Sequence, residues 1–364
     1  MNFDPLLSPH ASVEDLGVVT APSGMLILID GGMLNFWSHA RPPQVEAGTL
    51  SDPRLEGLIN TSVDLMVNGP DAVSAGLKFD RQWHPQFLYD IPVEGVNEIR
   101  HLFEECTKEH GLRAWLEQLN ERISHRQRVN FAIEWGKGRG EVQYHGMMAL
   151  AISSLPRDQA MRVYGVRMEQ QEYFDRWRWV WLEIRPGLQV RQSRLTGKVW
   201  VDRARLMFAD VDALGHWEHE NSLDGKADFV FWGKDAHIAA DKVGAPKITE
   251  GYGWLDLPID DAVKRGLRTE KVRKKRALKF ATDFRPHSHH YLVMRQIRSA
   301  ASESGVIEVG GAVMCAFMTS WGDGIFPVIA DLDEEGLLVR LRIDLGNEGS
   351  VAVTDELIKK SEER

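Results

Sequence analysis

Short apolar segments bounded by turn residues recur along this chain, and they predict more β-strands than helices. The clearest segment is 25–29, an unbroken apolar run between Pro22-Ser-Gly24 and Asp30-Gly-Gly32. The other predicted strands are 129–135, 142–144, 161–166, 173–184, 198–208, 228–232, 306–309, 312–318, 326–330 and 337–344. Because helices and strands alternate only in part, the sequence predicts an α+β fold with a largely antiparallel β-sheet core and flanking helices.

A helix pair is predicted in the N-terminal half, from apolar residues that recur three and four positions apart. Asn97 is placed to cap the first helix and Gly111 to end it, and the second helix is predicted over 112–123. Further helices are predicted at 235–243, 259–279 and 288–301.

The predicted organisation has three parts. Residues 1–155 form an N-terminal α+β region with the helix pair and a hairpin, 156–350 form a β-rich region, and 351–364 form a charged tail. The boundary is placed at Ser153-Ser-Leu-Pro-Arg157. No internal repeat of fixed period is evident.

The composition excludes wholesale disorder and a fibrous repeat. Hydrophobic residues make up 43% and charged residues 27% of the 364 residues, which allows a substantial buried core. The formal charge of −9 does not favour a general nucleic-acid binder. The longest apolar run, 312–318, is too short to span a membrane, no secretory signal is evident, and two cysteines make no disulfide framework. We therefore predict a cytoplasmic location and no membrane association.

Three clustered histidines are the residues most similar to metal ligands. His287, His289 and His290 follow Asp283, and imidazoles with a nearby carboxylate suit Zn²⁺ or another divalent ion. The spacing matches no metal motif of fixed geometry, and the alternative is a loop in which Ser288 caps the next helix. No cofactor is predicted, with a divalent metal ion as the alternative.

Three other motifs favour structural interpretations. The stretch 216–220 contains His and Glu without the zincin spacing, and the glycines at 136–140 lack the P-loop ending and indicate a hairpin tip. Trp177, Trp179 and Trp181 are predicted to share one face of a strand. They form either a stacking platform for bases or sugars or part of the core.

A basic run is the candidate for binding an anion or a partner. Residues 264–279 include nine Lys or Arg and a single Glu, and the candidate residues are Lys271, Arg273, Lys274, Lys275 and Arg276. Clustered cations can bind phosphate, nucleic acid or an acidic partner. The alternative is a solvated helix face.

A turn near the C-terminus carries a family resemblance. Glycines on both sides of Asp323 predict a tight turn, in which the carboxylate caps backbone N–H groups or points outward as a ligand. With the hairpin 331–336 and the strand ending at Asp344, the turn resembles the signature Gly/Ser-Trp-Gly-Asp-Gly-x-Tyr/Phe-Pro-Val of the bacterial domain-of-unknown-function family 4241. The signature residues here are Trp321, Gly322, Asp323, Gly324, Phe326 and Pro327.

Two upstream stretches resemble the same family. Residues 22–30 resemble its opening strand, and 200–210 resemble its Val-Asp-x-Gly … Phe-x-Asp segment, with Ala204 where the family has glycine. The resemblance implies a compact, β-rich bacterial cytoplasmic protein and no established reaction. The family-matched aspartates Asp202, Asp210 and Asp323 join the three histidines as candidate metal ligands.

Three functions are compatible with these patterns. We favour a non-enzymatic binding or protein-interaction module with an unidentified protein partner, because no motif has catalytic spacing. The alternatives are a metal-dependent phosphoester hydrolase, in which an ion held by the Asp and His candidates activates water, and a nucleotide or nucleic-acid binder that uses the basic run.

Overall fold

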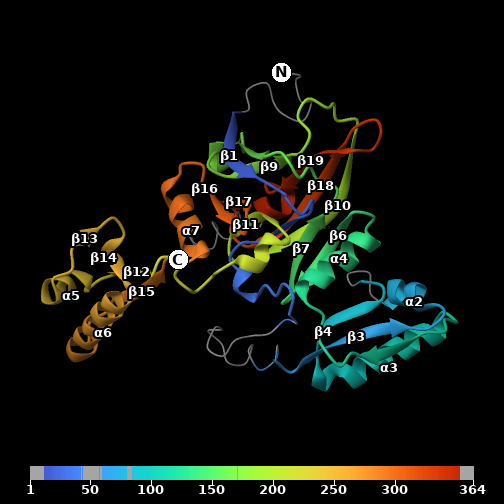
Figure 1. The fold of residues 1–364 in the computed structure, drawn as a ribbon, viewed down its shortest axis with the longest axis horizontal. Coiled ribbons are helices and arrows are strands. Elements are labelled where there is room, and N and C mark those ends of the chain that lie inside the picture. Colours follow the sequence, from blue (N-terminus) through green and yellow to red (C-terminus); the bar gives the residue numbers. More distant parts are fainter. Residues whose placement is uncertain are drawn as a thin grey trace. The chain divides into compact units, whose positions relative to one another are not determined.

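The computed structural model describes residues 12–41, 43, 57, 60–79, 84–169 and 171–352 (Figure 1). The chain forms two compact units. The main unit comprises Met1–His216 and Ala300–Arg364, and the inserted unit, Trp217–Ser299, lies between those segments in the sequence. The predicted ranges 1–155 and 156–350 follow a different division, since both contribute strands to the second large sheet of the main unit.

Two six-stranded antiparallel sheets form the core of the main unit. The first has the order β1 (Val13–Val19), β8 (Met161–Arg167), β9 (Trp177–Glu183), β19 (Leu338–Asp344), β18 (Gly324–Leu332) and β10 (Gln192–Val201). The second has the order β16 (Ser304–Val309), β17 (Ala312–Met318), β11 (Arg205–Asp210), β2 (Leu26–Asp30), β7 (Met147–Ile152) and β6 (Arg139–Tyr144). Both sheets supply one buried apolar cluster, which includes Trp177, Phe208, Phe317 and Phe326. This architecture confirms the predicted α+β fold with an antiparallel core.

A smaller sheet lies in the same unit. Its strand order is β4 (Phe87–Pro92), β3 (Ser62–Asn68) and β5 (Trp115–Gln118). The helices α2 (Ala72–Phe79) and α3 (Val96–Glu109) pack beside it, around a buried cluster that includes Phe103. Helix α4 (His125–Trp135) packs instead on β6 and β7.

The inserted unit has a matching construction. Its sheet has the order β13 (Lys247–Ile248), β14 (Gly251–Pro258), β12 (Lys226–Trp232) and β15 (Ala281–Pro286). The helices α5 (Ala236–Val243) and α6 (Ile259–Arg276) cover a core that includes Phe229 and Phe231, and α7 (His289–Ser299) follows β15.

The chain is built from two halves with the same order of elements. The first half runs from β1 to β9 and the second from β10 to β19, and each has a 3-10 helix after its second strand, η1 (Leu34–Phe36) or η4 (Ala213–His216). In each half, three strands and three helices then alternate, and four strands end the half. The second half has one additional strand, β13. When each strand is replaced by its counterpart in the other half, both large sheets keep the same strand order, read from the opposite edge. The two halves meet at the centre of the second sheet, where Leu28 of β2 pairs with Phe208 of β11. The large sheets therefore have a pseudo-two-fold arrangement.

Matched positions also share residues. Trp37-Ser-His39 matches Trp217-Glu-His219 at a separation of 180 residues, whereas Asp64 and Asp228 are 164 residues apart. Because the separation changes along the chain, the halves do not form a repeat of fixed period. The order of the elements is the clearest sign of the duplication.

Two elements predicted in the first half are wrong. The second helix of the predicted pair, 112–123, contains β5 instead, which pairs with β3, so only α3 of that pair forms. The predicted strand 129–135 is part of α4, and the glycines at 136–140 follow this helix rather than forming a hairpin tip. A capping box explains the helix, because Gln127 N–H donates to Ser124 Oγ while the Gln127 side chain accepts the Ser124 N–H.

The other predicted elements agree in position and differ at their ends. Strand β17 and helices α5, α6 and α7 lie within their predicted ranges. The predicted strand 198–208 is divided between β10 and β11 by a turn in which Ala204 has a φ of 53°. Gly24, the counterpart of Ala204 in the first half, has a φ of 77°. Glycine adopts this left-handed conformation at lower cost than residues with a side chain.

Asp331 is expected to make the stability of the main unit depend on pH. This buried carboxylate accepts hydrogen bonds from Ser193 Oγ and Arg342 Nε, both at 2.7 Å, and from Arg340. Although burial raises the pKa of the carboxyl, these donors lower it below 3.8. Because the folded-state pKa is depressed, the stabilisation is present above the unfolded-state pKa and is lost as the pH falls through the folded-state value.

We therefore expect the stability difference between the wild type and Asp331→Asn to shrink as the pH falls from about 5 to about 3. Urea unfolding at each pH measures this difference. A difference that does not change with pH would show that ionisation of Asp331 does not stabilise the sheet.

Candidate functional site

Each half brings two aspartates together between matched strands. In the first half, Asp64 of β3 lies opposite a β-bulge of β4, and Asp90 in that bulge has a φ of 57° and donates its N–H to Asp64 Oδ1 at 3.0 Å. In the inserted unit, Asp228 of β12 lies opposite the matching bulge of β14, and Asp256 in that bulge has a φ of 55° and donates its N–H to Asp228 Oδ1 at 2.7 Å. The duplicated backbone thus presents the same carboxylate pair twice.

Two arginines neutralise the first pair. Arg128 is fully buried, and its Nη1 donates to Asp90 Oδ2 at 2.7 Å while its Nη2 lies 3.5 Å from Asp64 Oδ2. Arg122 also contacts Asp90. Burial raises the pKa of the Asp64 carboxyl, and the guanidinium of Arg128 opposes part of that rise. The first pair is therefore an internal ion network.

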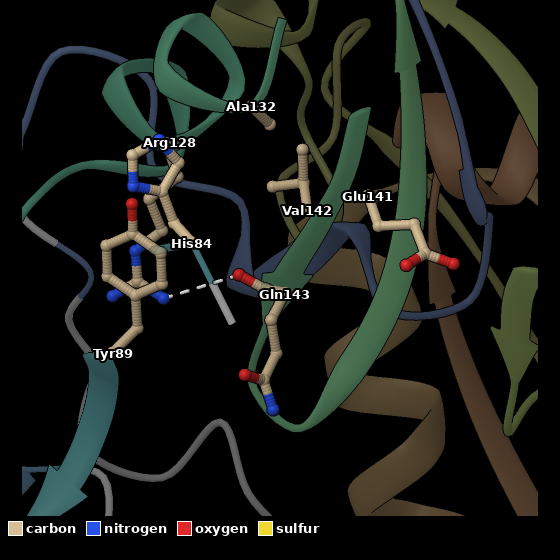
Figure 2. A pocket seen from close by; sticks show the side chains of 7 residues that line it. All are labelled: His84, Tyr89, Arg128, Ala132, Glu141, Val142 and Gln143. Atoms are coloured by element: carbon tan, nitrogen blue, oxygen red, sulfur yellow. Dashed lines mark hydrogen bonds between the residues drawn. The ribbon is translucent and has the colours of Figure 1, made fainter. Parts of the chain in front are cut away.

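A small pocket adjoins this network (Figure 2). Its lining residues are His84, Tyr89, Arg128, Ala132, Glu141, Val142 and Gln143. In Figure 2 the Arg128 guanidinium lies against the Tyr89 ring, 4.3 Å from its centroid, and donates to the Gln143 carbonyl. The water-accessible volume of about 10 Å³ has room for about one water molecule. The pocket therefore suits a bound water rather than a substrate.

The second pair lacks the matching arginines. When the N-caps of α4 and α7 are aligned, Leu292 takes the position of Arg128 and Pro286 takes that of Arg122. The carboxylates of the inserted unit are therefore without the two guanidinium groups that neutralise the first pair.

An imidazole stands beside the second pair. His287 Nε2 lies 3.1 Å from Asp228 Oδ1 and 3.8 Å from Asp256 Oδ1, while Nδ1 lies 3.0 Å from Asp224 Oδ2. Burial lowers the pKa of His287, but the hydrogen bonds to Asp224 and Asp228 outweigh it and raise the pKa above 6.5. Although burial raises the pKa of Asp224, the hydrogen bond from His287 contributes to lowering it to about 2. The cluster thus combines three carboxylates with one imidazole.

The cluster opens to solvent on one side. Asp228 and His287 are 2% and 3% exposed, whereas the side chain of Asp256 is 53% exposed. Arg295 Nη1 lies 3.7 Å from Asp256 Oδ1, but both side chains are more than half exposed, so water screens this ion pair. The cluster has oxygen and nitrogen donors and an accessible face, which are the properties of a cation-binding site.

The predicted metal candidates in the main unit serve as backbone caps or lie at the surface. Asp210 is buried and accepts the N–H and hydroxyl of Ser23, and Asp323 accepts the Ala204 N–H at 2.9 Å. The side chain of Asp202 is 61% exposed. These positions support the interpretation that acidic side chains shape turns.

The predicted histidines have separate roles. His289 Nδ1 accepts the Glu218 N–H at 2.9 Å and its ring stacks on Trp217, while His290 stacks on His219 at 4.1 Å. His287 is the predicted ligand that the structure joins to Asp228 and Asp256. The match of Val63-Asp-Leu … Gly69-Pro-Asp-Ala72 to Ala227-Asp-Phe … Gly233-Lys-Asp-Ala236 is the sequence signal that could have identified Asp228.

The basic run forms the C-terminal part of α6. Arg273 is paired with Glu270 at 2.9 Å and lies near the Phe280 ring. Within the described part of the chain, no carboxylate forms an ion pair with the exposed residues Arg268, Lys271, Lys274, Lys275 and Arg276. Cations in the last turn also stabilise the helix dipole, which accounts for part of this run.

The remaining motifs pack into the main unit. A register shift near the start of β9 separates Trp177, which is in the core, from Trp179, so the predicted tryptophan row on one face does not form. Trp321 Nε1 donates to the Trp177 carbonyl at 2.7 Å, Gly322 has a φ of 81°, and Phe326 is buried. The hydrogen bond from Trp321 therefore holds the signature turn, which precedes β18, against the start of β9.

Comparisons of the chain with protein-family models, with curated proteins and with solved structures give no match. The similarity to family 4241 accordingly stays a prediction. In the described part of the chain, no helix combines the length and apolar character needed to cross a membrane.

Proposed function

We propose that the protein is a non-enzymatic binding protein that holds an acidic protein partner on helix α6. The observation that carries the proposal is the exposed basic side chains of α6 that lack carboxylate partners among the described residues. The chain as a whole has a charge of −9, so this helix is a local basic surface on an acidic protein. Opposite charges across an interface steer association and select the partner.

The matched helix of the first half supports this interpretation. Helices α3 and α6 follow the matched prolines Pro92 and Pro258, and both pack beside a sheet. Their charges are opposite, because α3 has four Glu against one Arg and one Lys, whereas α6 has eight Lys or Arg against three acidic residues. The fold therefore does not require a basic helix at this place, which favours an external reason for the charge of α6.

Apolar residues on α6 favour a protein over a nucleic acid as the partner. Leu267 is 68% exposed and Val263 is 41% exposed, and their four-residue spacing places them on one face beside Lys271 and Lys274. Protein interfaces combine an apolar centre with a polar rim, whereas contacts with nucleic-acid phosphates are made by cationic and other polar groups.

Charge reversal on α6 tests the proposal. Tagged full-length protein is expressed in its native host, and the retained protein is identified, purified and titrated against variants. We expect the triple change Lys271→Glu, Lys274→Glu and Lys275→Glu to weaken binding at least about 10-fold, and Leu267→Ser to weaken it without changing its salt dependence. The matched control Lys234→Glu, Lys242→Glu and Lys247→Glu makes the same charge change elsewhere in the inserted unit and should bind as the wild type does.

Equal binding by the two triple variants would refute a role for α6. Recovery that disappears after nuclease treatment would instead support the nucleic-acid binder. Association of the chain with itself at low but not high salt, measured by sedimentation, would identify a second copy as the acidic partner.

A metal-dependent hydrolase is a second candidate, favoured by the cluster of Asp228, Asp256 and His287. An ion at this place would lower the pKa of a bound water and polarise a phosphoester. Hydrolysis of p-nitrophenyl phosphate that requires Mn²⁺ and is lost in Asp256→Asn would support it. No turnover by the Mn²⁺-loaded wild type on phosphomonoester and phosphodiester substrates would count against it.

A further inference from the structure

The carboxylate pair of the inserted unit has the geometry of a metal site. One ligand atom from each of Asp228, Asp256 and His287 lies within 4.8 Å of the other two. The two carboxylates come from neighbouring antiparallel strands, and the imidazole comes from the loop between β15 and α7. Three side chains from different elements therefore converge on one place.

A hydrogen bond to Asp224 fixes the orientation of the His287 imidazole. The hydrogen bond between His287 Nδ1 and Asp224 directs Nε2 towards Asp228 and Asp256. Histidine ligands of metals are usually held in this way, by a carboxylate on the ring nitrogen that does not bind the ion. Tyr291 donates its hydroxyl to the second oxygen of Asp228 and holds that side chain as well.

The first half shows what this carboxylate pair binds. There the guanidinium of Arg128 bridges Asp64 and Asp90, so a cation stands between the two carboxylates. The inserted unit retains the bulge, the left-handed aspartate and the N–H to carboxylate hydrogen bond, but has Leu292 at the arginine position. The carboxylate pair that a guanidinium bridges in the first half therefore has no guanidinium bridge in the second, where the imidazole of His287 lies beside it.

We propose that Asp228, Asp256 and His287 bind a divalent transition-metal ion. Two carboxylate oxygens and one imidazole nitrogen suit Zn²⁺ or Mn²⁺ better than Ca²⁺ or Mg²⁺, which prefer oxygen ligands alone. Asp224 positions the imidazole as an outer group. Because Asp256 is half exposed, the remaining coordination positions face solvent and can hold water or an anionic ligand. The proposal does not depend on the partner proposed for α6.

The test uses full-length protein freed of metal with EDTA and then gel-filtered. Mn²⁺ binding is followed by the loss of the free-ion electron paramagnetic resonance signal, and Zn²⁺ binding by competition with a chromophoric chelator. We expect one ion per chain, with an affinity at least about 10-fold lower in Asp256→Asn and His287→Asn and about 10- to 100-fold lower in Asp224→Asn. Asparagine tolerates the left-handed conformation, so Asp256→Asn removes a ligand charge while keeping the backbone.

A control variant and a measurement of thermal stability complete the test. Asp283→Asn, which removes a carboxylate elsewhere on the same sheet, is the matched control and should bind as the wild type does. Added Zn²⁺ should raise the melting temperature of the wild type and of this control, but not that of Asp256→Asn. Absence of stoichiometric binding in the wild type, or binding that Asp256→Asn leaves unchanged, would overturn the proposal even if His287→Asn failed to fold.

Discussion

Replacing Arg128 by leucine is expected to lower the free energy of unfolding by about 3–5 kcal/mol, although leucine is the residue that the second half has at the matching position. The arginine is fully buried between Asp64, which is fully buried, and Asp90, whose side chain is 20% exposed. Its removal leaves carboxylates in a poorly solvated place without their main counter-charge, and Arg122 remains to compensate only part of it. Urea unfolding followed by circular dichroism measures the change.

Arg126→Leu is the control on the same helix. Arg126 pairs with Asp212, whose side chain is 52% exposed, so its loss should cost about 1 kcal/mol or less. A loss below about 1 kcal/mol for Arg128→Leu as well would show that the Asp64 and Asp90 carboxylates are stable without a buried cation, and would weaken the comparison between the halves.

Phe208→Ala is expected to destabilise the main unit by about 3–5 kcal/mol. Phe208 is fully buried at the centre of the second large sheet, opposite Leu28, with the ring of Phe317 at 6.0 Å. Truncation removes apolar contacts with both halves at once, because this strand pair joins them, and the surrounding strands are too constrained to close the cavity.

Phe174→Ala provides the comparison, since its side chain is 68% exposed and its removal should change the stability by about 0.5 kcal/mol or less. The two variants are compared by thermal and urea unfolding. Similar small losses in both would contradict the assignment of the β2–β11 pair as the centre of the core.

Local patterns were sufficient where a segment has a strong period and clear ends. Residues 312–318 are uninterrupted apolar residues after two glycines, and they form β17 as predicted. Residues 112–123 show the limit, because their apolar spacing fits a helix, while β3 offers Leu116 and its neighbours a sheet edge that sequence spacing does not reveal.

The candidate site was predicted only through His287. Asp228 stands in a segment predicted as a strand, Asp256 stands where no element was predicted, and neither has a neighbour with metal-ligand spacing. They meet because β14 has a bulge opposite Asp228 and Asp256 within it is left-handed, so both carboxylates turn to the same side, and these features arise from strand pairing.

The sequence alone determined the class of fold, since period-two and period-3.6 apolar patterns reflect forces that act within a few residues. The division into a main and an inserted unit, the pairing of the two halves and the meeting of two aspartates with one histidine were decided by the tertiary structure. These contacts join residues far apart in the chain, and their free energy depends on the whole set of strands that close around them.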